Sequence, residues 1–358
     1  MGPDLNELLA RARGDLRLGV PVVLRGATGA VLVAAAETLS SDRLREMQQM
    51  GALDMAVTDR RAETLKARPY DGDLARIVVP RDADRRWIEG VADPSEDLAR
   101  PMKGPLVTRR EGNAVLHRVG IALCKAARLL PAALLVPVPA DYAASELLTE
   151  LDAVAAGPLM SGLHALGHVV SARVPLRAAE NARLHIFRPG DGTEEHYAIE
   201  IGRPDRSKPV LARLHSACFT GDVIGSLKCD CGPQLDAALA QMGDQGEGVL
   251  LYLQQEGRGI GLANKMRAYA LQDQGFDTVE ANHRLGFEDD ERDFRLGAQM
   301  LGNLGFKSVR LLTNNPAKIA MMSACGIEVT ERVPLKVGLS EHNERYLAVK
   351  AAKSGHLL

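Results

Sequence analysis

The sequence predicts an α/β protein with mixed sheets, arranged in two domains. Short apolar runs of strand length alternate with longer segments whose apolar residues repeat at helical spacing, an order typical of helices packed on a sheet. A length of 358 residues fits two domains of ordinary size. A loop rich in Gly, Pro and Ala at 157–167 marks the expected boundary, giving domains at 1–165 and 170–358.

Short-range signals set the expected elements of the first domain. Apolar runs rich in Val, Ile and Ala predict strands, and helices are predicted where a capping residue precedes an apolar repeat or where proline ends one. The expected strands are 30–36, 54–59 and 75–80, and the expected helices run from Ser40 or Ser41 to Gly51, from Val115 to Leu130 before Pro131, and over 146–157.

The second domain carries clearer signals. Apolar side chains recur at helical spacing in two places, and Asn315 followed by Pro316 is a helix start with a capping side chain and a proline in the first turn. Helices are expected around Leu235, Ala238, Leu239 and Met242, around Phe294, Ala298 and Leu301, and over 260–275; strands are expected at 248–255 and 308–314.

The composition excludes several classes of protein. Lys and Arg total 44 against 46 Asp and Glu, which argues against broad electrostatic capture of nucleic acid or of an anionic membrane. The most apolar stretch, 131–140, contains three prolines and is far shorter than the roughly 20 residues that span a membrane. The acidic N-terminal residues lack the apolar core of a signal peptide. Five cysteines make no disulfide framework, so reduced thiols and a cytoplasmic location are expected, with Cys124 and Cys325 in the core.

Three cysteines of the second domain have the spacing of metal ligands. Cys218, Cys229 and Cys231 form C-x10-C-x-C, and His215 lies just upstream. Thiolates are strong zinc ligands, and three protein ligands leave a fourth position where a water can be activated. The spacing leaves two alternatives open: a closed structural site with His215 as the fourth ligand, and a set of ordinary buried cysteines.

Two strand-to-helix junctions are candidate phosphate sites. QQEGRGIGLANK at 254–265 is a glycine-rich turn before a helix, where Arg258 could reach a phosphate; a tight turn with a solvated arginine is the alternative. It is no dinucleotide fingerprint, because Leu262 and Asn264 stand where a glycine is needed. Lys318 opposes the dipole of its helix unless an anion binds there, the alternative being an exposed lysine. The acidic run at 287–294 suits a helix start.

These motifs occur in an order that resembles GTP cyclohydrolase II, the family that commits GTP to riboflavin synthesis. The resemblance runs from about Arg173 to the C-terminus and rests on RLHSACFTGD, LKCDCGPQLDAAL, QEGRGIGLANKMRAYALQDQGFDTVEAN, DERDF, VRLLTNNPAKI and ERVPL. It implies zinc-dependent opening of the guanine imidazole ring of GTP, with release of formate and pyrophosphate to give 2,5-diamino-6-(ribosylamino)-pyrimidinone 5'-phosphate. It also implies one Zn²⁺ per chain, Mg²⁺ with the GTP phosphates, and a homodimer.

The resemblance also assigns roles to residues of this chain. A guanidinium stays protonated in proteins, so Arg292, which matches the family's proposed nucleophile, equally suits a charge clamp on the departing pyrophosphate. Glu256 is expected to accept from the N–H edge of guanine. The zinc ligands fall on Cys218, Cys229 and Cys231, the general base on Asp290, an assisting tyrosine on Tyr269, and the GTP contacts on Arg213, Leu214, His215, Ser216, Ala217, Gln234, Glu256, Gly257, Arg258, Thr278, Thr313 and Lys318.

Three positions depart from the family pattern. Ala217, Gln254 and Gly259 stand where the family usually has Glu, Arg and Asn. Loss of a charge on each side of the site could weaken GTP binding or change the substrate. Two alternatives to a GTP cyclohydrolase II therefore stay open: a related ring-opening hydrolase acting on another nucleotide or pyrimidine, and a zinc-stabilised nucleotide sensor without turnover.

The N-terminal domain resembles, more faintly, dihydroxybutanone-phosphate synthase. LRGATGAVLVAAAETLSSDRLREMQQMGA follows the strand and helix pattern of that family, and KAARLLPAALLVPV matches the end of its domain. The metal-binding G-H-T-E motif is absent from 115–118, and four acids are missing from the loop R-E-D-E-G-D-L. We expect a retained fold without synthase activity, serving as a scaffold or a dimerisation module. That loop stands here as Arg25, Gly26, Ala27, Thr28, Gly29, Ala30 and Val31.

Overall fold

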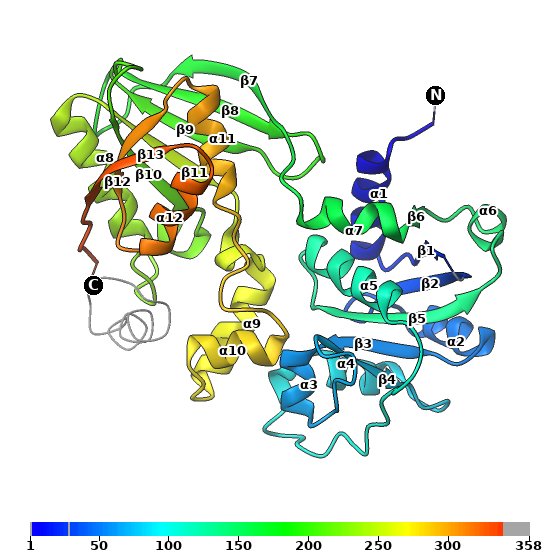
Figure 1. Cartoon of the computed structure of the whole chain (residues 1–358). Coiled ribbons are helices and arrows are strands. Elements are labelled where there is room, and N and C mark those ends of the chain that lie inside the picture. Colours follow the sequence, from blue (N-terminus) through cyan, green and yellow to red (C-terminus); the bar gives the residue numbers. More distant parts are fainter. Residues whose placement is uncertain (1, 28, 339–358) are drawn as a thin grey trace. The chain divides into compact units, whose positions relative to one another are not determined.

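The computed structural model describes residues 2–27 and 29–338, which fall into two compact units (Figure 1). The first unit extends to Gly162 and also contains Ala263–Asp290. The second comprises Leu163–Leu262 and the described residues from Glu291 onward. Each unit is built on a mixed sheet with helices, which confirms the predicted fold class. The grouping of Ala263–Asp290 with the N-terminal residues is a feature that a contiguous division of the sequence does not contain.

The sheet of the first unit has six described strands in the order β4-β3-β5-β2-β1-β6. The pair β1–β6 is parallel, and the other neighbouring pairs are antiparallel. The strands are β1 (Val22–Gly26), β2 (Gly29–Ala35), β3 (Asp54–Thr58), β4 (Leu74–Val78), β5 (Ala132–Val138) and β6 (Glu150–Asp152).

Capping side chains define where several helices of the first unit begin. Asp4, Ser40, Thr58, Asp84 and Asp152 each accept a hydrogen bond from a backbone N–H of the following turn. The helices are α1 (Leu5–Arg17), α2 (Ser41–Met50), α3 (Asp59–Leu65), α4 (Arg85–Ala92), α5 (Val115–Ala126), α6 (Tyr142–Ser145), α7 (Ala153–Ser161), α9 (Leu262–Asp273) and α10 (Thr278–Leu285), with a 3-10 turn at Pro94–Glu96.

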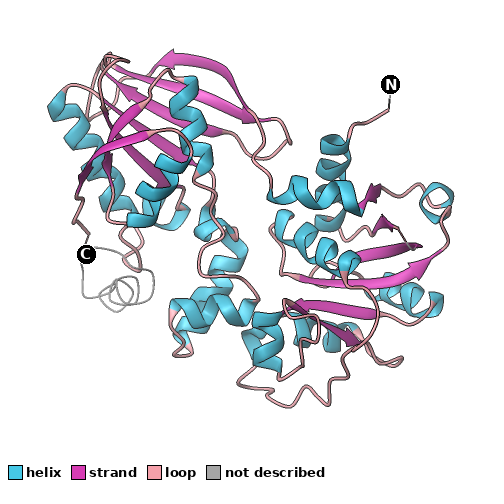
Figure 2. Ribbon diagram, in the orientation of Figure 1, coloured by secondary structure: helices cyan, strands magenta, loops and turns pink. Residues whose placement is uncertain are grey.

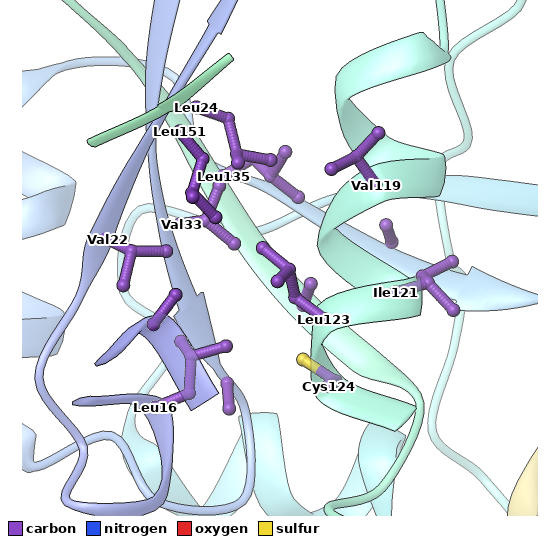
Figure 3. Packing of buried hydrophobic residues seen from close by; sticks show 14 of the residues in the cluster. Leu16, Val22, Leu24, Val33, Val119, Ile121, Leu123, Cys124, Leu135 and Leu151 are labelled. Carbon is purple, nitrogen blue, oxygen red and sulfur yellow. The ribbon is translucent and has the colours of Figure 1, made fainter. Parts of the chain in front are cut away.

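The core of the first unit forms where α5 packs on the sheet (Figure 3). Leu123 of α5 is fully buried in this cluster, as are Val33 of β2 and Leu135 of β5. Gly120 allows the close approach of α5, because a Cβ there would lie 3.4 Å from Cγ1 of Val33 and 3.3 Å from Cβ of Ala133. The apolar periodicity of the sequence at 115–126 therefore corresponds to a helix face that is buried against strands.

The described strands of the second unit, part of the magenta arrows of Figure 2, form one sheet. Their order is β13-β12-β10-β11-β9-β8-β7, and the sheet combines parallel and antiparallel neighbours. Neighbours from β13 to β11 are parallel, and those from β11 to β7 are antiparallel. The elements are β7 (Leu166–Arg173), β8 (Ala182–Pro189), β9 (His196–Ile201), β10 (Val210–Ser216), β11 (Gly248–Leu253), β12 (Ser308–Leu312), β13 (Glu328–Val333), α8 (Cys231–Gln245), α11 (Arg295–Asn303) and α12 (Pro316–Ala324), with a π turn at Phe219–Val223 and a 3-10 turn at Glu256–Gly259.

Local signals in the sequence predict several of these elements correctly. Ser40 caps α2, and Asn315 caps α12 with Pro316 in its first turn, both as expected. The helix expected over 146–157 is wrong, because Glu150–Asp152 pairs with β1 as a strand and the helix begins only at Ala153. The helix from Val115 ends at Ala126, before the expected Leu130.

The two cysteines expected in the core differ from each other. Cys124 is buried, and burial raises the pKa of its thiol to about 12. Cys325 is exposed at the end of α12, so its assignment to the core is wrong. Within the described ranges, no helix has the length and apolar character needed to cross a membrane. Thr28 of the loop at 25–31 lies outside the described residues.

Replacing Leu123 with Ala is expected to destabilise the first unit by about 2–5 kcal/mol, because it leaves a cavity in the cluster of Figure 3. Trp87 is the one tryptophan of the chain and lies on α4, so its fluorescence during urea unfolding reports on this unit. Leu18→Ala removes an exposed leucine and should change the free energy of unfolding by less than about 0.5 kcal/mol. Equal losses in the two variants would contradict the placement of Leu123.

Candidate active site

The candidate site lies at the carboxyl ends of three parallel strands of the second unit. β10 pairs with β11 on one side and with β12 on the other. Cys218 follows β10, Glu256–Arg258 follows β11 and Lys318 follows β12. Because the carboxyl ends of parallel strands meet at one edge of a sheet, residues from three separate motifs come to the same edge. Nζ of Lys318 donates to the carbonyl oxygen of Leu214 at 2.9 Å, which links two of these segments directly.

The three predicted zinc ligands converge around a glycine. The Sγ atoms of Cys218, Cys229 and Cys231 all lie within 4.8 Å of one another, and those of Cys218 and Cys229 are 3.7 Å apart. Zinc–sulfur bonds of about 2.3 Å in tetrahedral geometry place sulfurs about 3.8 Å apart. A Cβ on Gly221 would lie 2.7 Å from Sγ of Cys229 and 2.9 Å from Cβ of Cys231, so glycine is needed there. The donor set and its spacing fit zinc.

The electrostatics of this cluster also favour a bound cation. Hydrogen bonding with Cys218 and Cys229, together with burial, raises the pKa of Cys231 well above its ordinary value. Three thiolates this close repel one another, so a cation is what allows all three to ionise together. The N–H of Gly221 donates to Sγ of Cys218 at 3.3 Å and stabilises negative charge there. Among the described residues, these three cysteines form the one group of at least three Cys, His, Asp or Glu side chains close enough to bind one metal ion, and no histidine belongs to it.

Asp222 and Tyr252 are two residues of the site that sequence reasoning missed. The buried carboxylate of Asp222 accepts from the backbone N–H of Cys218 at 3.0 Å and from the hydroxyl of Tyr252 at 2.8 Å. Nε2 of His215 lies 3.1 Å from the same carboxylate, and the His215 ring stacks on that of Tyr252. Asp222 therefore orients the first thiol-bearing residue. Its only signal in the sequence is its position four residues after Cys218.

His215 is held as a neighbour of the thiols through Asp222. Burial lowers the pKa of His215, so its ring is neutral near neutral pH. A neutral imidazole has one N–H to donate, and the carboxylate of Asp222 is the acceptor beside Nε2. This contact explains why a histidine stands three residues before the first ligand without joining the sulfur cluster.

Arg213, on β10, is a buried positively charged residue of the second unit. Its guanidinium donates to Oε1 of Gln234 at 2.5 Å and to the carbonyl oxygen of Leu312 at 3.4 Å. Nε of Arg213 is buried and has no hydrogen-bond acceptor among the described residues. Burial lowers the pKa of Arg213 to about 10, which still leaves a cation at neutral pH. A buried donor without an acceptor is costly, so this nitrogen suits a polar or anionic ligand.

Arg292 and Lys318 place two further cations around one aromatic ring. Cζ of Arg292 lies 4.8 Å from the centroid of the Phe294 ring, and Nζ of Lys318 lies 4.6 Å from it. Arg292 also donates to Oγ of Ser216 at 3.4 Å. Cation–π contacts of this kind attract a charged group to the face of the ring. The charge of Lys318, which opposes its helix dipole, is thus partly compensated by the Phe294 ring and by the Leu214 carbonyl.

The glycine-rich turn after β11 is a strained loop. Gly257 and Arg258 both have left-handed backbone conformations, with φ of 64° and 59°, and this is uncommon for a side chain such as arginine. Oε2 of Glu256 accepts from the N–H of Phe219 at 2.6 Å, which ties the turn to the segment after Cys218. Sparsely populated backbone conformations held by such contacts are typical of functional sites.

The departure from the family pattern at Gly259 has a structural reason. The carbonyl oxygen of Arg258 accepts from the N–H of Glu291 at 3.0 Å, which brings the 291–292 backbone against the turn. A Cβ on Gly259 would lie 2.7 Å from the carbonyl oxygen of Glu291. Gly259 also has a φ of 95°, so an asparagine there would be strained as well as crowded. Ala217 is buried, and its N–H donates to the Leu253 carbonyl at 2.8 Å.

The remaining predicted residues divide between the two units. Thr313 is buried at the end of β12, and its Oγ1 accepts from the N–H of Asn315 at 3.0 Å. Tyr269, Thr278 and Asp290 belong to the first unit. The ring of Tyr269 on α9 lies 5.8 Å from Nζ of Lys265; Thr278 begins α10, and Asp290 is exposed at the end of the segment. The roles of these three residues stay predictions.

Comparison with known proteins identifies the family. A family model described as GTP cyclohydrolase II matches residues 167–334. A GTP cyclohydrolase-2 from Azospirillum brasilense is 44% identical over 357 residues, which cover 97% of this chain and 93% of that protein. The chain belongs to the GTP cyclohydrolase II family. The resemblance seen in the motifs from Cys218 to Lys318 is thereby confirmed.

Two further relatives match only part of the chain. A GTP cyclohydrolase-2 from Azotobacter vinelandii is 57% identical over 175 residues, covering 49% of this chain and 84% of that protein. A riboflavin biosynthesis protein RibBA from Bacillus mycoides is 60% identical over 165 residues, covering 46% of this chain and 42% of that protein. The relative from Azospirillum, in contrast, aligns along nearly the whole chain.

Replacing Cys229 with Ser is expected to lower the zinc content of the purified protein from one ion per chain to a small fraction of that, because one of three thiolate ligands is lost. Inductively coupled plasma mass spectrometry measures the stoichiometry. Cys325→Ser is the matched control, since Cys325 is exposed and lies outside the cluster. Equal zinc contents in the two variants would contradict the assignment of the site.

Proposed function

We propose that this chain is a zinc-dependent GTP cyclohydrolase II, which hydrolyses GTP, opens the imidazole ring of guanine at carbon 8 and releases formate and pyrophosphate. The convergence of three thiols at an edge of the sheet that also presents cations carries the proposal. The product would be 2,5-diamino-6-(ribosylamino)-pyrimidinone 5'-phosphate, which makes the reaction the first step of riboflavin biosynthesis. Membership of the family and the name of the Bacillus relative support this.

Cys218, Cys229 and Cys231 would hold the zinc. A zinc ion with three protein ligands supplies Lewis-acid activation of a water at neutral pH. Asp222 fixes the backbone of Cys218 through the 3.0 Å hydrogen bond, so the thiol cluster is pre-arranged. The carbon 8 atom of guanine would leave as formate once both of its bonds to nitrogen have been hydrolysed.

The cations of the site suit the triphosphate. Nε of Arg213 offers a donor that the described protein does not use, and Arg292 and Lys318 present charged groups fixed over Phe294. Positioned cations stabilise the negative charge that develops on a departing pyrophosphate, which is the role proposed for Arg292 as a charge clamp. Magnesium prefers oxygen ligands, and the metal-ligand group found among the described residues consists of thiols. The magnesium expected with GTP would therefore be bound by the triphosphate.

Glu256 suits recognition of guanine. Its two carboxylate oxygens each accept one backbone N–H, from Phe219 at 2.6 Å and from Gly257 at 2.9 Å. A carboxylate can accept hydrogen bonds from the N–H edge of guanine, which adenine lacks. Asp290 as general base and Tyr269 as an assisting group are carried over from the resemblance alone.

Incubation of the zinc-loaded chain with GTP and Mg²⁺ is expected to release formate and pyrophosphate, and Cys229→Ser is expected to abolish formate release while Cys325→Ser does not. Formate is followed by a coupled dehydrogenase assay and pyrophosphate by a coupled phosphatase assay. Bound GTP without either product would favour a nucleotide sensor, and failure to bind GTP would favour a hydrolase for another nucleotide. Persistent formate release by Cys229→Ser would rule out zinc as the source of the activated water.

We infer that the N-terminal unit has no synthase activity. Arg25 forms an ion pair with Glu150 at 2.7 Å, and Ala30 and Val31 are buried apolar residues of β2. In the region that would carry the G-H-T-E motif, His117 stands 3.6 Å from Asp54 and Arg118 pairs with Asp73. In the loop, Gly26, Ala27 and Ala30 thus stand where the synthase has acids for metal binding and proton abstraction, and the region of the metal motif carries Arg118. We also propose that the chain forms a homodimer and is located in the cytoplasm.

The intact chain is expected to leave ribulose 5-phosphate unchanged in the presence of Mg²⁺, because the acids of the loop at 25–31 are missing. Nuclear magnetic resonance of the sugar phosphate measures its disappearance. An active dihydroxybutanone-phosphate synthase under the same conditions serves as the positive control. Turnover above the rate without protein would show that the unit has retained its own chemistry.

A further inference from the structure

A segment of the cyclohydrolase domain is packed in the N-terminal unit. The family model covers residues 167–334 without interruption, yet Ala263–Asp290 is grouped with the residues up to Gly162 (Figure 1). This segment contains α9 and α10. Ala281, Leu285 and Phe287 within it are almost fully buried. The N-terminal unit therefore buries side chains of a segment that belongs, by sequence, to the cyclohydrolase domain.

Arg267 of α9 is the polar centre of this packing. Its Nε donates to Oδ2 of Asp93 at 3.0 Å, and another nitrogen lies 3.1 Å from Oε1 of Glu37. A third contact, to Oδ1 of Asn264 at 2.7 Å, fixes the side chain along its own helix. A guanidinium that binds two carboxylates from different elements holds both position and orientation, which a lysine cannot do.

A second anchor lies at the end of α10. Oγ1 of Thr58 donates to the carbonyl oxygen of Gly286 at 2.9 Å in a buried position. Gly286 has a φ of 88°, and a Cβ there would lie 2.8 Å from Cγ of Pro131. The guanidinium of Arg60 pairs with Glu288 at 3.0 Å. The segment is thus attached near its beginning, through Arg267, and near its end, through Gly286 and Glu288.

At both ends, the segment continues along the chain into residues of the candidate active site. The chain enters the segment at Ala263, shortly after the strained turn that contains Arg258, and leaves it at Asp290, two residues before Arg292. The hydrogen bond from the N–H of Glu291 to the carbonyl oxygen of Arg258 joins these two ends. The segment is therefore directly continuous in the chain with the backbone that carries Arg258 and Arg292.

Shorter relatives show that a cyclohydrolase of this family exists without such a unit. The 175 matched residues make up 84% of the Azotobacter relative, which leaves no room for an N-terminal unit of this size. The Azospirillum relative aligns over 97% of this chain and includes that unit. In this chain, the contacts made by Arg267 with Glu37 and Asp93 need the N-terminal unit.

We propose that the N-terminal unit acts as a positioning platform for residues 263–290, and that Arg267 is the positioning residue through which it sets the geometry of the active site. This inference rests on the proposed function. Arg267 touches no reacting group; it acts by fixing α9 against Asp93 and Glu37. Its loss lowers the rate of the chemical step more than the binding of GTP, because small misplacements of reacting groups are costly.

The cavity beside Arg267 makes a rescue experiment possible. Arg267, Glu37, Asp93 and Trp87 line a cavity of about 980 Å³ in the first unit, so a guanidinium ion in solution can reach the two carboxylates. In the full-length protein, Arg267→Ala is expected to lower kcat for formate release about 10-fold, with KM for GTP and zinc content little changed. Low concentrations of guanidinium chloride should restore part of kcat, and methylammonium should restore less.

The matched control is Arg85→Ala, which removes a cation from the lining of the same cavity. Arg85 pairs with Glu89 on its own helix and donates to the carbonyl oxygen of Leu39, so kcat should stay at the wild-type value. Asp93→Asn, which retains the shape of the side chain, should reduce kcat in the same direction as Arg267→Ala. Wild-type kcat in both Arg267→Ala and Asp93→Asn would overturn the proposal, as would a lost rate that guanidinium does not restore in a folded variant.

Amide hydrogen exchange separates this proposal from the proposed function. Exchange in α9 and α10 of the intact chain should be faster in Arg267→Ala than in Arg85→Ala, whatever the reaction is. If the wild-type chain releases no formate from GTP, the proposed function fails while the exchange data still test the docking of the segment. Unchanged exchange in α9 and α10 of Arg267→Ala would overturn the positioning role itself.

Discussion

The close approach of three sulfur atoms is the constraint on which the second unit depends. The 3.7 Å between the thiols of Cys218 and Cys229 is possible only because Gly221 has no side chain between them. Gly232 is needed for the same reason, since a Cβ there would lie 2.4 Å from the carbonyl oxygen of Gly221. The π turn after β10, the start of α8 and the buried carboxylate of Asp222 all serve this arrangement. Repulsion between thiolates makes the arrangement unfavourable without a cation, so metal binding and local folding are linked there.

Elements governed by neighbours in the chain were predictable from the sequence. Ser40 and Asn315 act on the N–H groups of the next turn, so their capping role can be recognised without knowledge of the rest of the molecule. Glu150–Asp152 is different, because these residues become a strand only through pairing with β1, more than a hundred residues earlier. Cys325 likewise has apolar neighbours in sequence, but its position at the end of α12 leaves it exposed. Tertiary contacts override local propensity in both cases.

The candidate site shows the same division. The spacing of the three cysteines predicted their convergence, because ligand chemistry limits what such a pattern can do. Asp222 and Tyr252 could not be recognised, since a carboxylate and a phenol acquire their role only from the fold that buries them together. The packing of Gly259 against Glu291 gives a reason for a departure that the sequence could present only as a missing side chain. The grouping of Ala263–Asp290 with the N-terminal residues has no local signal, because its contacts join residues more than a hundred positions apart.

The burial of Phe287 and the close approach of Gly286 to Pro131 bear on which residues of the N-terminal unit can be substituted during evolution. Under the proposed loss of synthase chemistry, residues of the loop at 25–31 would no longer be constrained by that reaction. Thr58 and Pro131 touch the sheltered segment and do not share this freedom. Deletion of the N-terminal half would expose Phe287 to water and leave the segment without its anchors. If the proposed loss of synthase activity and the proposed positioning role both hold, selection would preserve the surface of the N-terminal unit for the segment that it holds and not for a reaction of its own.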